Sequence, residues 1–301
     1  KDDIITDYEN IRDDLVAALY GVWDHIKNGG NHGAENHGLE WVGMLPGTRE
    51  SRRLMGDYIL DETDILDNRI FEDAVAYGGW CVDLHCPHGL LDTDIMPSGD
   101  CRFYDGVYTI PYRSYYSKNI SNLFMAGRNI SATKLGMCST RIIGCCAVGG
   151  QAVGAAAALC TKYACDPRGL TPHITELQQL LLRRDCFIPG FKNEDVLDLA
   201  RSATFTASSA KAGCEPAKVI DGISRRLGED AHGWVSEGIR EGGEVLTMKF
   251  GEVKSISELA LTFESDFNDP NAQLAAIGAF LKDHRECKVT IKSYADVQTG
   301  N

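Results

Sequence analysis

Basic side chains are scarce in this sequence relative to acidic ones. Across 301 residues, 30 lysines and arginines stand against 43 aspartates and glutamates, which leaves a formal net charge of −13. Such a surface repels polyanions on average, so the balance argues against nucleic acid or an anionic membrane as the partner. Apolar residues make up 44% of the chain. This content is enough for packed cores and excludes intrinsic disorder as the main state, and the length predicts about two domains.

The chain also lacks the cysteine spacing of a small disulfide-stapled protein. It has 11 cysteines, an odd number, so at least one thiol is unpaired, and most stand in apolar surroundings typical of buried thiols. Cys145 and Cys146 are adjacent within a predicted helix, where their side chains point about 100° apart, which argues against a redox pair. No basic segment leads into an apolar one near Lys1, so no signal peptide is visible.

One apolar run, residues 142–160, is long enough to raise the question of a membrane span. Gln151 is its only clearly polar residue. The run consists mostly of glycine and alanine, so its transfer into lipid is weakly favourable, and we expect no transmembrane segment. Its four glycines instead predict a long helix whose backbone lies very close to a sheet or a ligand: Gly144, Gly149, Gly150 and Gly154.

Hydrophobic periodicity and turn residues predict helices, loops and a short strand before about residue 200, followed by a β part. Apolar residues at helical spacing predict a helix over 10–27, and Thr171-Pro172 predicts the start of a helix that ends near Asp185. A short buried strand is expected over 122–126, whereas glycine and other turn residues predict loops over 28–50 and 76–105.

After about residue 200, short alternating runs separated by turn residues predict an all-β module, a sandwich. The runs are 204–209, 245–250, 259–263 and 289–291. We place the boundary near residue 198, which gives domains 1–198 and 199–301.

The stretch from 108 to 160 carries the strongest indication of a ligand site. A predicted buried strand runs into Gly127, Arg128 and Asn129, and a loop then reaches Ser139-Thr140-Arg141 before the small-residue helix. A helix N-terminus carries roughly +0.5 charge and free N–H groups, and the two arginines add positive charge, so the pattern suits an anionic or electron-rich ligand. A strand–loop–helix unit that merely packs would show the same pattern.

An ordered set of motifs resembles the C-terminal part of FAD-dependent oxidoreductases of the glutathione-reductase-like flavoprotein superfamily. The subgroup it looks like is the one often found in bacterial polysaccharide-degrading loci. The motifs span about 40 to 160 and comprise Leu45 to Tyr58, Asp73 to Trp80, Pro111 to Tyr116, Asn122 to Ser131, Ser139 to Arg141 and Gly150 to Gly154.

The resemblance implies an α/β flavoprotein fold with FAD as cofactor. It assigns Gly127, Arg128 and Asn129 to the turn that closes over the ribityl and pyrophosphate groups. By the same resemblance, Ser139, Thr140 and Arg141 lie at the flavin pyrimidine edge. Reduced flavin is anionic near N1 and O2, so a helix dipole and hydrogen-bond donors there favour reduction.

This sequence departs from the family pattern in two places. Related sequences often carry histidine where Lys134 stands, which puts an acid/base role there in doubt. In addition, no Gly-x-Gly-x-x-Gly follows a strand within 1–60. We therefore expect an incomplete FAD/NAD(P)-binding-type domain, the C-terminal portion of a longer flavoenzyme. On this expectation the N-terminal dinucleotide-binding segment is missing from the chain, which binds FAD weakly or not at all and is inactive as it stands.

Candidates on the substrate side are Arg49 and His85. Arg49, with Arg52, could clamp a carboxylate or a flavin phosphate, or belong to a solvated surface cluster. His85 could face the substrate and transfer a proton, or be a hydrogen-bonded structural histidine. With Cys86 and His88 it also invites a metal interpretation, but no third and fourth ligands are evident, so no metal is predicted.

Residues 203–295 look like a discoidin (coagulation factor type C) galactose-binding-like domain. The similarity rests on Thr206 to Ser209, Ala217 to Gly222, Trp234 to Ser236 and Leu246 to Gly251. It implies an all-β sandwich that presents glycans or surfaces on its end loops, in relatives with a Ca²⁺ site near Asp221. Trp234 is expected in the core, and an attached module of this kind favours an extracytoplasmic location.

Two functions from different classes follow. The first is a flavin-dependent oxidoreductase that takes a hydride from an organic substrate, with a carbohydrate or carbohydrate-derived acid suggested by the accessory module. The second is a non-catalytic glycan-binding protein with a vestigial flavin fold. A polysaccharide lyase or hydrolase would need paired carboxylates in one cleft, which no spacing selects.

Overall fold

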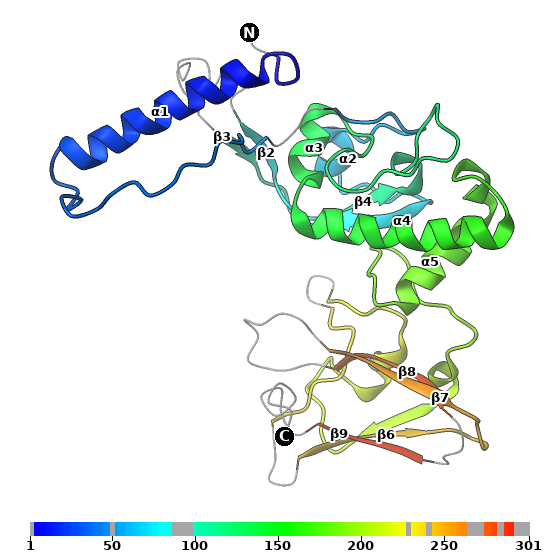
Figure 1. Cartoon of the computed structure of the whole chain (residues 1–301). Helices are drawn as coiled ribbons and strands as arrows, with labels where there is room; N and C mark the ends of the chain where they lie inside the picture. The colour runs from blue at the N-terminus through cyan, green and yellow to red at the C-terminus, as the bar shows by residue number, and fades with distance from the viewer. Residues whose placement is uncertain are drawn as a thin grey trace.

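Two separate clusters of buried apolar side chains organise the chain (Figure 1). The computed structural model describes residues 3–48, 52–85, 99–226, 230–238, 243–263, 274–281 and 286–291, the last two ranges for the backbone alone. The elements of the first part are α1 (Tyr8–Asn28), α2 (Glu62–Leu66), β1 (Ala74–Gly78), β2 (Val82–His85), β3 (Gly99–Arg102), β4 (Tyr108–Pro111), η1 (Tyr112–Ser114), α3 (Lys134–Thr140), α4 (Ile143–Tyr163), η2 (Arg168–His173) and α5 (Ile174–Arg183). Those of the second part are η3 (Leu199–Ser202), β5 (Thr204–Ala207), η4 (Pro216–Ile220), β6 (Glu244–Lys249), β7 (Ser257–Phe263), β8 (Leu274–Leu281) and β9 (Glu286–Ile291).

The first helix confirms the prediction made from apolar spacing over residues 10–27. None of the residues of α1 is buried, however, and Leu15, Leu19 and Val22 on its apolar stripe stay exposed. Figure 1 shows α1 standing away from α3, α4 and α5, with the β2–β3 pair between them in this view. The stripe therefore adds nothing to either of the two cores.

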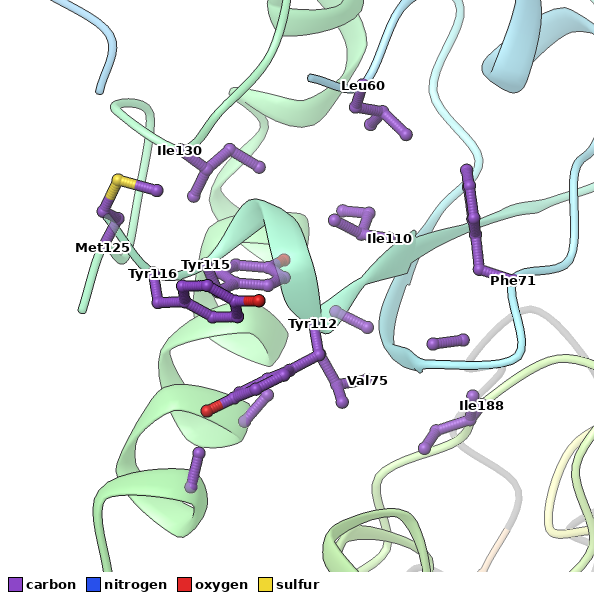
Figure 2. Close-up of a cluster of buried hydrophobic side chains, with 14 of the residues drawn as sticks. Leu60, Phe71, Val75, Ile110, Tyr112, Tyr115, Tyr116, Met125, Ile130 and Ile188 are labelled. Atoms are coloured by element: carbon purple, nitrogen blue, oxygen red, sulfur yellow. The ribbon is translucent and has the colours of Figure 1, made fainter. Parts of the chain in front are cut away.

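The first core forms where a small antiparallel sheet meets α4 and α5. β1 pairs with β4, with Gly78 opposite Tyr108, and every residue of β4 is buried. Directly after β4, Tyr112 and Tyr115 are fully buried and lie beside α4 (Figure 2). Burial of one large apolar side chain stabilises by about 1.5–3 kcal/mol, so this aromatic segment holds the sheet and α4 in a fixed relation.

A second antiparallel pair, β2 with β3, corrects the loop predicted over residues 76–105. Val82 lies opposite Arg102, and His85 lies opposite Gly99. A disulfide joins Cys81, the residue just before β2, to Cys101 within β3. The loop prediction is also wrong for β1. Gly78 pairs with Tyr108 in this strand, and it is a glycine because the Tyr108 hydroxyl occupies the place where a Cβ would project.

Two further local predictions are corrected. The segment 122–126, predicted as a strand, makes only a single bridge, from Phe124 to Tyr116. Thr171-Pro172 lies within the 3-10 turn η2 and does not start a helix. α5 begins at Ile174 and ends at Arg183, close to the end predicted near Asp185.

α4 confirms the long helix predicted over residues 142–160. By length and composition it could cross a membrane, but 33% of its most apolar window is buried inside the protein. Ala152, Ala156 and Leu159 lie in the first core. These contacts give α4 the packing of a core helix on one side, and its other side is exposed.

The glycines of α4 are not equivalent. A Cβ added at Gly149 would lie 2.5 Å from the Tyr115 hydroxyl oxygen, whereas one at Gly144, Gly150 or Gly154 would meet nothing within 4 Å. The close backbone approach predicted for this helix is therefore made at Gly149.

The second part contains two small antiparallel sheets, in the orders β5-β6-β9 and β7-β8. Leu246 and Met248, on alternate positions of β6, join Trp234 in the second apolar cluster. Trp234 is 3% exposed and its indole nitrogen donates to the Ser209 carbonyl at 2.8 Å, which confirms its expected place in the core. The strands predicted after residue 200 are present, and β8 is an additional one. These sheets do not show a galactose-binding sandwich.

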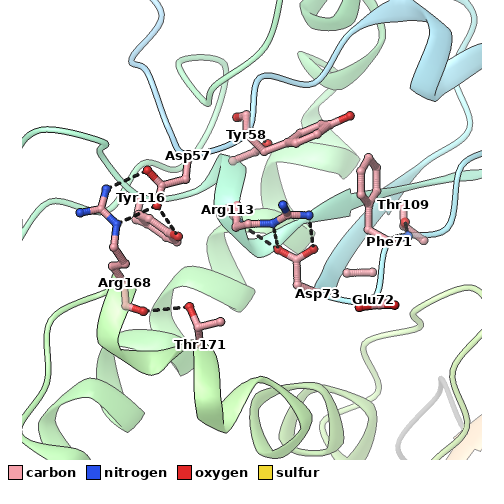
Figure 3. Close-up of polar contacts among 12 residues, drawn as sticks. Asp57, Tyr58, Phe71, Glu72, Asp73, Thr109, Arg113, Tyr116, Arg168 and Thr171 are labelled. Carbon is pink, nitrogen blue, oxygen red and sulfur yellow. Dashed lines mark hydrogen bonds and ion pairs between the residues drawn. The ribbon is translucent and has the colours of Figure 1, made fainter.

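Two arginine–carboxylate pairs tie distant segments of the first part together (Figure 3). Asp73, just before β1, accepts from Nε and Nη2 of Arg113 at 2.9 and 3.1 Å. Asp57 accepts from Nε and Nη2 of Arg168, both at 2.7 Å, and from the Tyr116 hydroxyl at 2.9 Å. Both arginines bind in the two-pronged geometry that suits a carboxylate.

The Asp57 pair predicts a pH-dependent contribution to stability. The hydrogen bond from Arg168, helped by the one from Tyr116, lowers the pKa of Asp57 against the opposing effect of burial. An unfolded aspartate has a pKa of about 3.9. The stabilisation is therefore fully present above that pH and is lost as the pH falls through the lower folded-state pKa.

We expect Asp57→Asn to lower the free energy of unfolding by about 0.5–1 kcal/mol at pH 7, because Arg168 is half exposed. The difference from the parent should shrink as the pH falls below the unfolded-state pKa of about 3.9. Urea unfolding at pH 7 and at a pH below this value measures it, with Glu35→Gln at an exposed carboxylate as the control. An equal loss at both pH values would contradict the assignment.

Candidate functional site

The turn at Gly127 is the first part of the candidate site. Gly127 has a φ of +88°, a backbone conformation that side chains with a Cβ rarely adopt. A Cβ there would meet only the Asn129 side-chain oxygen, at 3.9 Å. The space beside the turn is therefore open to a ligand. The Asn129 carbonyl accepts from the Leu54 amide at 3.0 Å, which anchors the turn to the chain before β1.

The N-terminus of α4 is the second part. Ile142 at its N-cap provides no side-chain cap, so the first-turn N–H groups remain available for a ligand. Ile143 is 86% exposed, and nothing lies within 4 Å of the position of a Gly144 Cβ. Just before this helix, the buried Thr140 hydroxyl has no hydrogen-bond partner among the residues that the structure describes. An uncapped helix N-terminus with an unsatisfied hydroxyl beside it fits an anionic or electron-rich group.

Arg128 belongs to the Gly127 turn and acts electrostatically on the first turn of α4. Burial raises the pKa of the Cys146 thiol in the first turn of α4, and the positive charge of Arg128 acts against this rise, which places the guanidinium within electrostatic reach of that turn. Arg128 is exposed and donates to the neutral Thr48 carbonyl at 3.1 Å. Within the described residues no carboxylate pairs with Arg128, so its charge can attract an anion.

Ser139, assigned to cofactor binding by resemblance, is fully buried. Its hydroxyl donates to the Trp80 carbonyl at 2.5 Å and lies 2.8 Å from the Tyr108 hydroxyl. Tyr104 donates to the same Trp80 carbonyl at 3.0 Å, and burial raises the pKa of Tyr104 to about 12. The network is uncharged at neutral pH and fixes the end of α3 against the chain that leads into β2.

Arg141 and His85, predicted to serve the cofactor and the substrate, meet through a shared carboxylate. Arg141 donates to Asp83 Oδ2 at 2.7 Å and to the Asp83 carbonyl at 3.2 Å. His85 Nε2 lies 3.1 Å from the same Oδ2. The Arg141 side chain is 12% exposed and that of His85 46%. The charge of Arg141 is thus largely compensated, and His85 is held at an accessible edge.

Asp83 is the residue whose role the sequence analysis missed. Asp83 and His85 stand two apart in β2, so their side chains share one face of the strand. A strand prediction for this segment would have paired them, but the segment was predicted as loop.

The other candidates add little. Arg49, Cys86 and His88 lie outside the described residues. Lys134 is exposed at the start of α3. No group of three His, Cys, Asp or Glu side chains suited to a metal occurs within the described ranges.

Comparison with known proteins gives one match. The family model described as FAD dependent oxidoreductase matches residues 3–181, a range that contains the Gly127 turn, Asp83 and the start of α4. No curated protein and no solved structure matches the chain. The comparisons give no support to the discoidin-like resemblance of residues 203–295.

Proposed function

Because the chain belongs to the FAD dependent oxidoreductase family, we propose that it acts in hydride transfer from an organic substrate. FAD is the cofactor of this family, and when bound it accepts the two electrons and proton of a hydride from a C–H or C–OH group. The observation that carries the proposal is the open, uncapped N-terminus of α4 with the Gly127 turn and Arg128 beside it.

The residues at this end of the fold suit the charge of the cofactor. The N–H groups of the first turn of α4 present a partial positive charge, and Arg128 adds a full one. The open space at Gly127 and Gly144 allows the backbone to approach a flat group closely. We propose that these groups hold the electron-rich edge and the phosphates of FAD, and that the Thr140 hydroxyl donates to the cofactor. Ser139 supports the site through the Trp80 carbonyl.

His85 is the proposed proton-transfer residue on the substrate side. Because a carboxylate accepts hydrogen bonds, Asp83 keeps the proton of the His85 ring on Nε2 and leaves Nδ1 to face a substrate. Asp83 and Arg141 are positioning residues, since they act through His85 and through the end of α3. Arg49 is proposed as a further substrate clamp.

A substitution at Arg128 tests the cofactor site. We expect Arg128→Gln to weaken FAD binding about tenfold, equivalent to about 1.4 kcal/mol, because it removes an uncompensated charge next to the helix N-terminus. FAD fluorescence titration of residues 1–301 measures the affinity and also tests the expectation that this stretch binds FAD weakly or not at all. Arg184→Gln, at an exposed arginine after α5, is the control. Equal affinity of the two variants would count against the site.

The reaction itself is tested by anaerobic reduction. A substrate of the proposed class should bleach the absorbance of oxidised flavin in FAD-loaded protein, and His85→Gln should slow this bleaching while FAD affinity stays unchanged. Loss of FAD affinity in His85→Gln would instead assign His85 to cofactor binding.

A carbohydrate-derived substrate and a glycan-binding role for residues 199–301 remain proposals that rest on the sequence resemblance alone. The second apolar cluster is separate from the first, which supports the proposed boundary near 198. Retention of the whole chain on immobilised glycans, competed by the free sugar, would support the glycan-binding role. Passage of the chain through every such matrix would count against it.

A further inference from the structure

We propose that His25 and His32, at the C-terminal end of α1, form a binding site for a divalent transition-metal ion of the Zn²⁺ and Ni²⁺ class. The two Nε2 atoms lie 3.1 Å apart. Both side chains are exposed, and the C-terminal end of α1 stands away from β2 and α4, which carry the candidate flavin site (Figure 1). The site is therefore independent of the proposed function.

The separation of the ring nitrogens is that of two ligands on one ion. Zn²⁺–imidazole bonds are about 2.0–2.1 Å long, so two nitrogens at angles between square and tetrahedral stand about 2.9–3.4 Å apart. The rings meet edge to face, with centroids 4.9 Å apart and planes inclined at 67°, which aims both Nε2 atoms at one region. Without a metal, one Nε2–H donates to the other nitrogen. Binding needs only that this proton move to Nδ1 of the same ring, so each imidazole stays neutral.

The loop that returns His32 to His25 is built for this approach. Gly30, Asn31 and Gly33 all have positive φ, at +84°, +69° and +65°, and such residues reverse the chain within a few positions. At Gly29, a Cβ would lie 2.5 Å from the His25 carbonyl oxygen, so a side chain there would force the turn open.

Lys27 fixes the far side of the same loop. Its ammonium donates to the carbonyls of Ala34, Glu35 and His37 at 3.0, 2.6 and 2.8 Å. The three bonds hold the loop against the last turn of α1, and they use all three hydrogen-bond donors of the lysine. The loop that carries His32 is thus ordered on its C-terminal side before any ion arrives, which lowers the entropic cost of binding.

The Lys27 ammonium bonds neutral carbonyls, so its positive charge opposes a nearby cation, but two features of the surrounding field favour one. The site lies at the negative end of the α1 dipole, and the whole chain carries a net charge of −13. Imidazole nitrogen suits Zn²⁺, Ni²⁺ and Cu²⁺ and not Ca²⁺ or Mg²⁺, which take oxygen ligands. The described residues offer no third His, Cys, Asp or Glu side chain to complete a cluster here, so water fills the remaining positions.

Calorimetric titration of the whole chain with ZnCl₂ and NiCl₂ tests the proposal. We expect a one-to-one site, and at least about a tenfold weaker affinity in His25→Gln and in His32→Gln, because either change removes the chelate. His37→Gln, at an exposed histidine of the same loop, is the matched control and should bind as the parent does. Affinity should fall on acidification, since a metal binds the neutral ring.

A second readout locates the ion. Diethylpyrocarbonate modification mapped by mass spectrometry should show His25 and His32 protected by the metal and His37 still reactive. The proposal is overturned if the parent binds neither ion at millimolar concentration. It is also overturned if His25→Gln and His32→Gln bind as the parent does, or if the metal leaves both histidines as reactive as before.

Discussion

We expect Gly149→Ala to lower the free energy of unfolding by about 2 kcal/mol, although alanine is the better helix former. The added Cβ would lie 2.5 Å from the hydroxyl oxygen of Tyr115 and 2.7 Å from its Cε1 atom. Tyr115 is 2% exposed and belongs to the segment after β4, with its hydroxyl against α4 at Gly149, so its ring has no free space to enter. Overpacking of this kind costs about 1–3 kcal/mol.

Gly154→Ala is the matched control on the same helix. A Cβ at Gly154 meets nothing within 4 Å, so this change keeps the gain in helix propensity, about 1 kcal/mol, without the collision. The propensity gain is common to both variants, and their difference in urea unfolding therefore isolates the contact with Tyr115. Equal stability of the two variants would show that α4 does not pack on Tyr115 in this way.

The second large effect is expected at Asp73, which is 9% exposed and accepts from Arg113 through three nitrogens. Asp73→Asn should lower the free energy of unfolding by about 2 kcal/mol. The charge-assisted bonds to a guanidinium are then weakened and a donor is placed where acceptors are needed. The full cost of breaking a buried ion pair is not expected, because the Arg113 side chain is 42% exposed and can turn to water.

Asp100→Asn provides the comparison for this charge effect. Asp100 and Arg102 form a pair with an Nε–Oδ2 distance of 3.4 Å, and both side chains are more than 40% exposed, so its loss should cost less than about 0.5 kcal/mol. Thermal or urea unfolding of both variants measures the contrast. A loss at Asp73 as small as at Asp100 would mean that the Asp73–Arg113 pair does not hold β1 to η1.

The candidate site shows which of its features follow from local sequence. The uncapped start of α4 and the turn at Gly127 follow from glycine, small residues and an N-cap position without a capping side chain. The different hydrogen-bond partners of Arg128 and Arg141 do not follow from local sequence. One donates to a neutral carbonyl and the other to a carboxylate, and both carbonyl and carboxylate belong to segments at least 58 positions away along the chain.

Two local errors in the sequence analysis have different causes. Gly78 stands in β1 as a glycine because the Tyr108 hydroxyl packs where a Cβ would project, and a turn-based rule assigns such a residue to a loop. That contact comes from outside the local window. Thr171-Pro172 has the composition of a helix start, but it lies within η2, which precedes α5, and the Thr171 hydroxyl donates to the Arg168 carbonyl.

The sequence by itself determined the acidic charge of the protein, the helices α1 and α4, most strands after residue 200 and the family resemblance. These properties depend on residue type and on spacing within a few positions. Tertiary structure alone decided that Gly149 and not Gly154 touches a tyrosine, that Asp83 joins His85 to Arg141, and that the apolar stripe of α1 stays exposed. Each of these depends on which distant segments come into contact. Contacts between segments tens of residues apart produce no periodic pattern in the sequence.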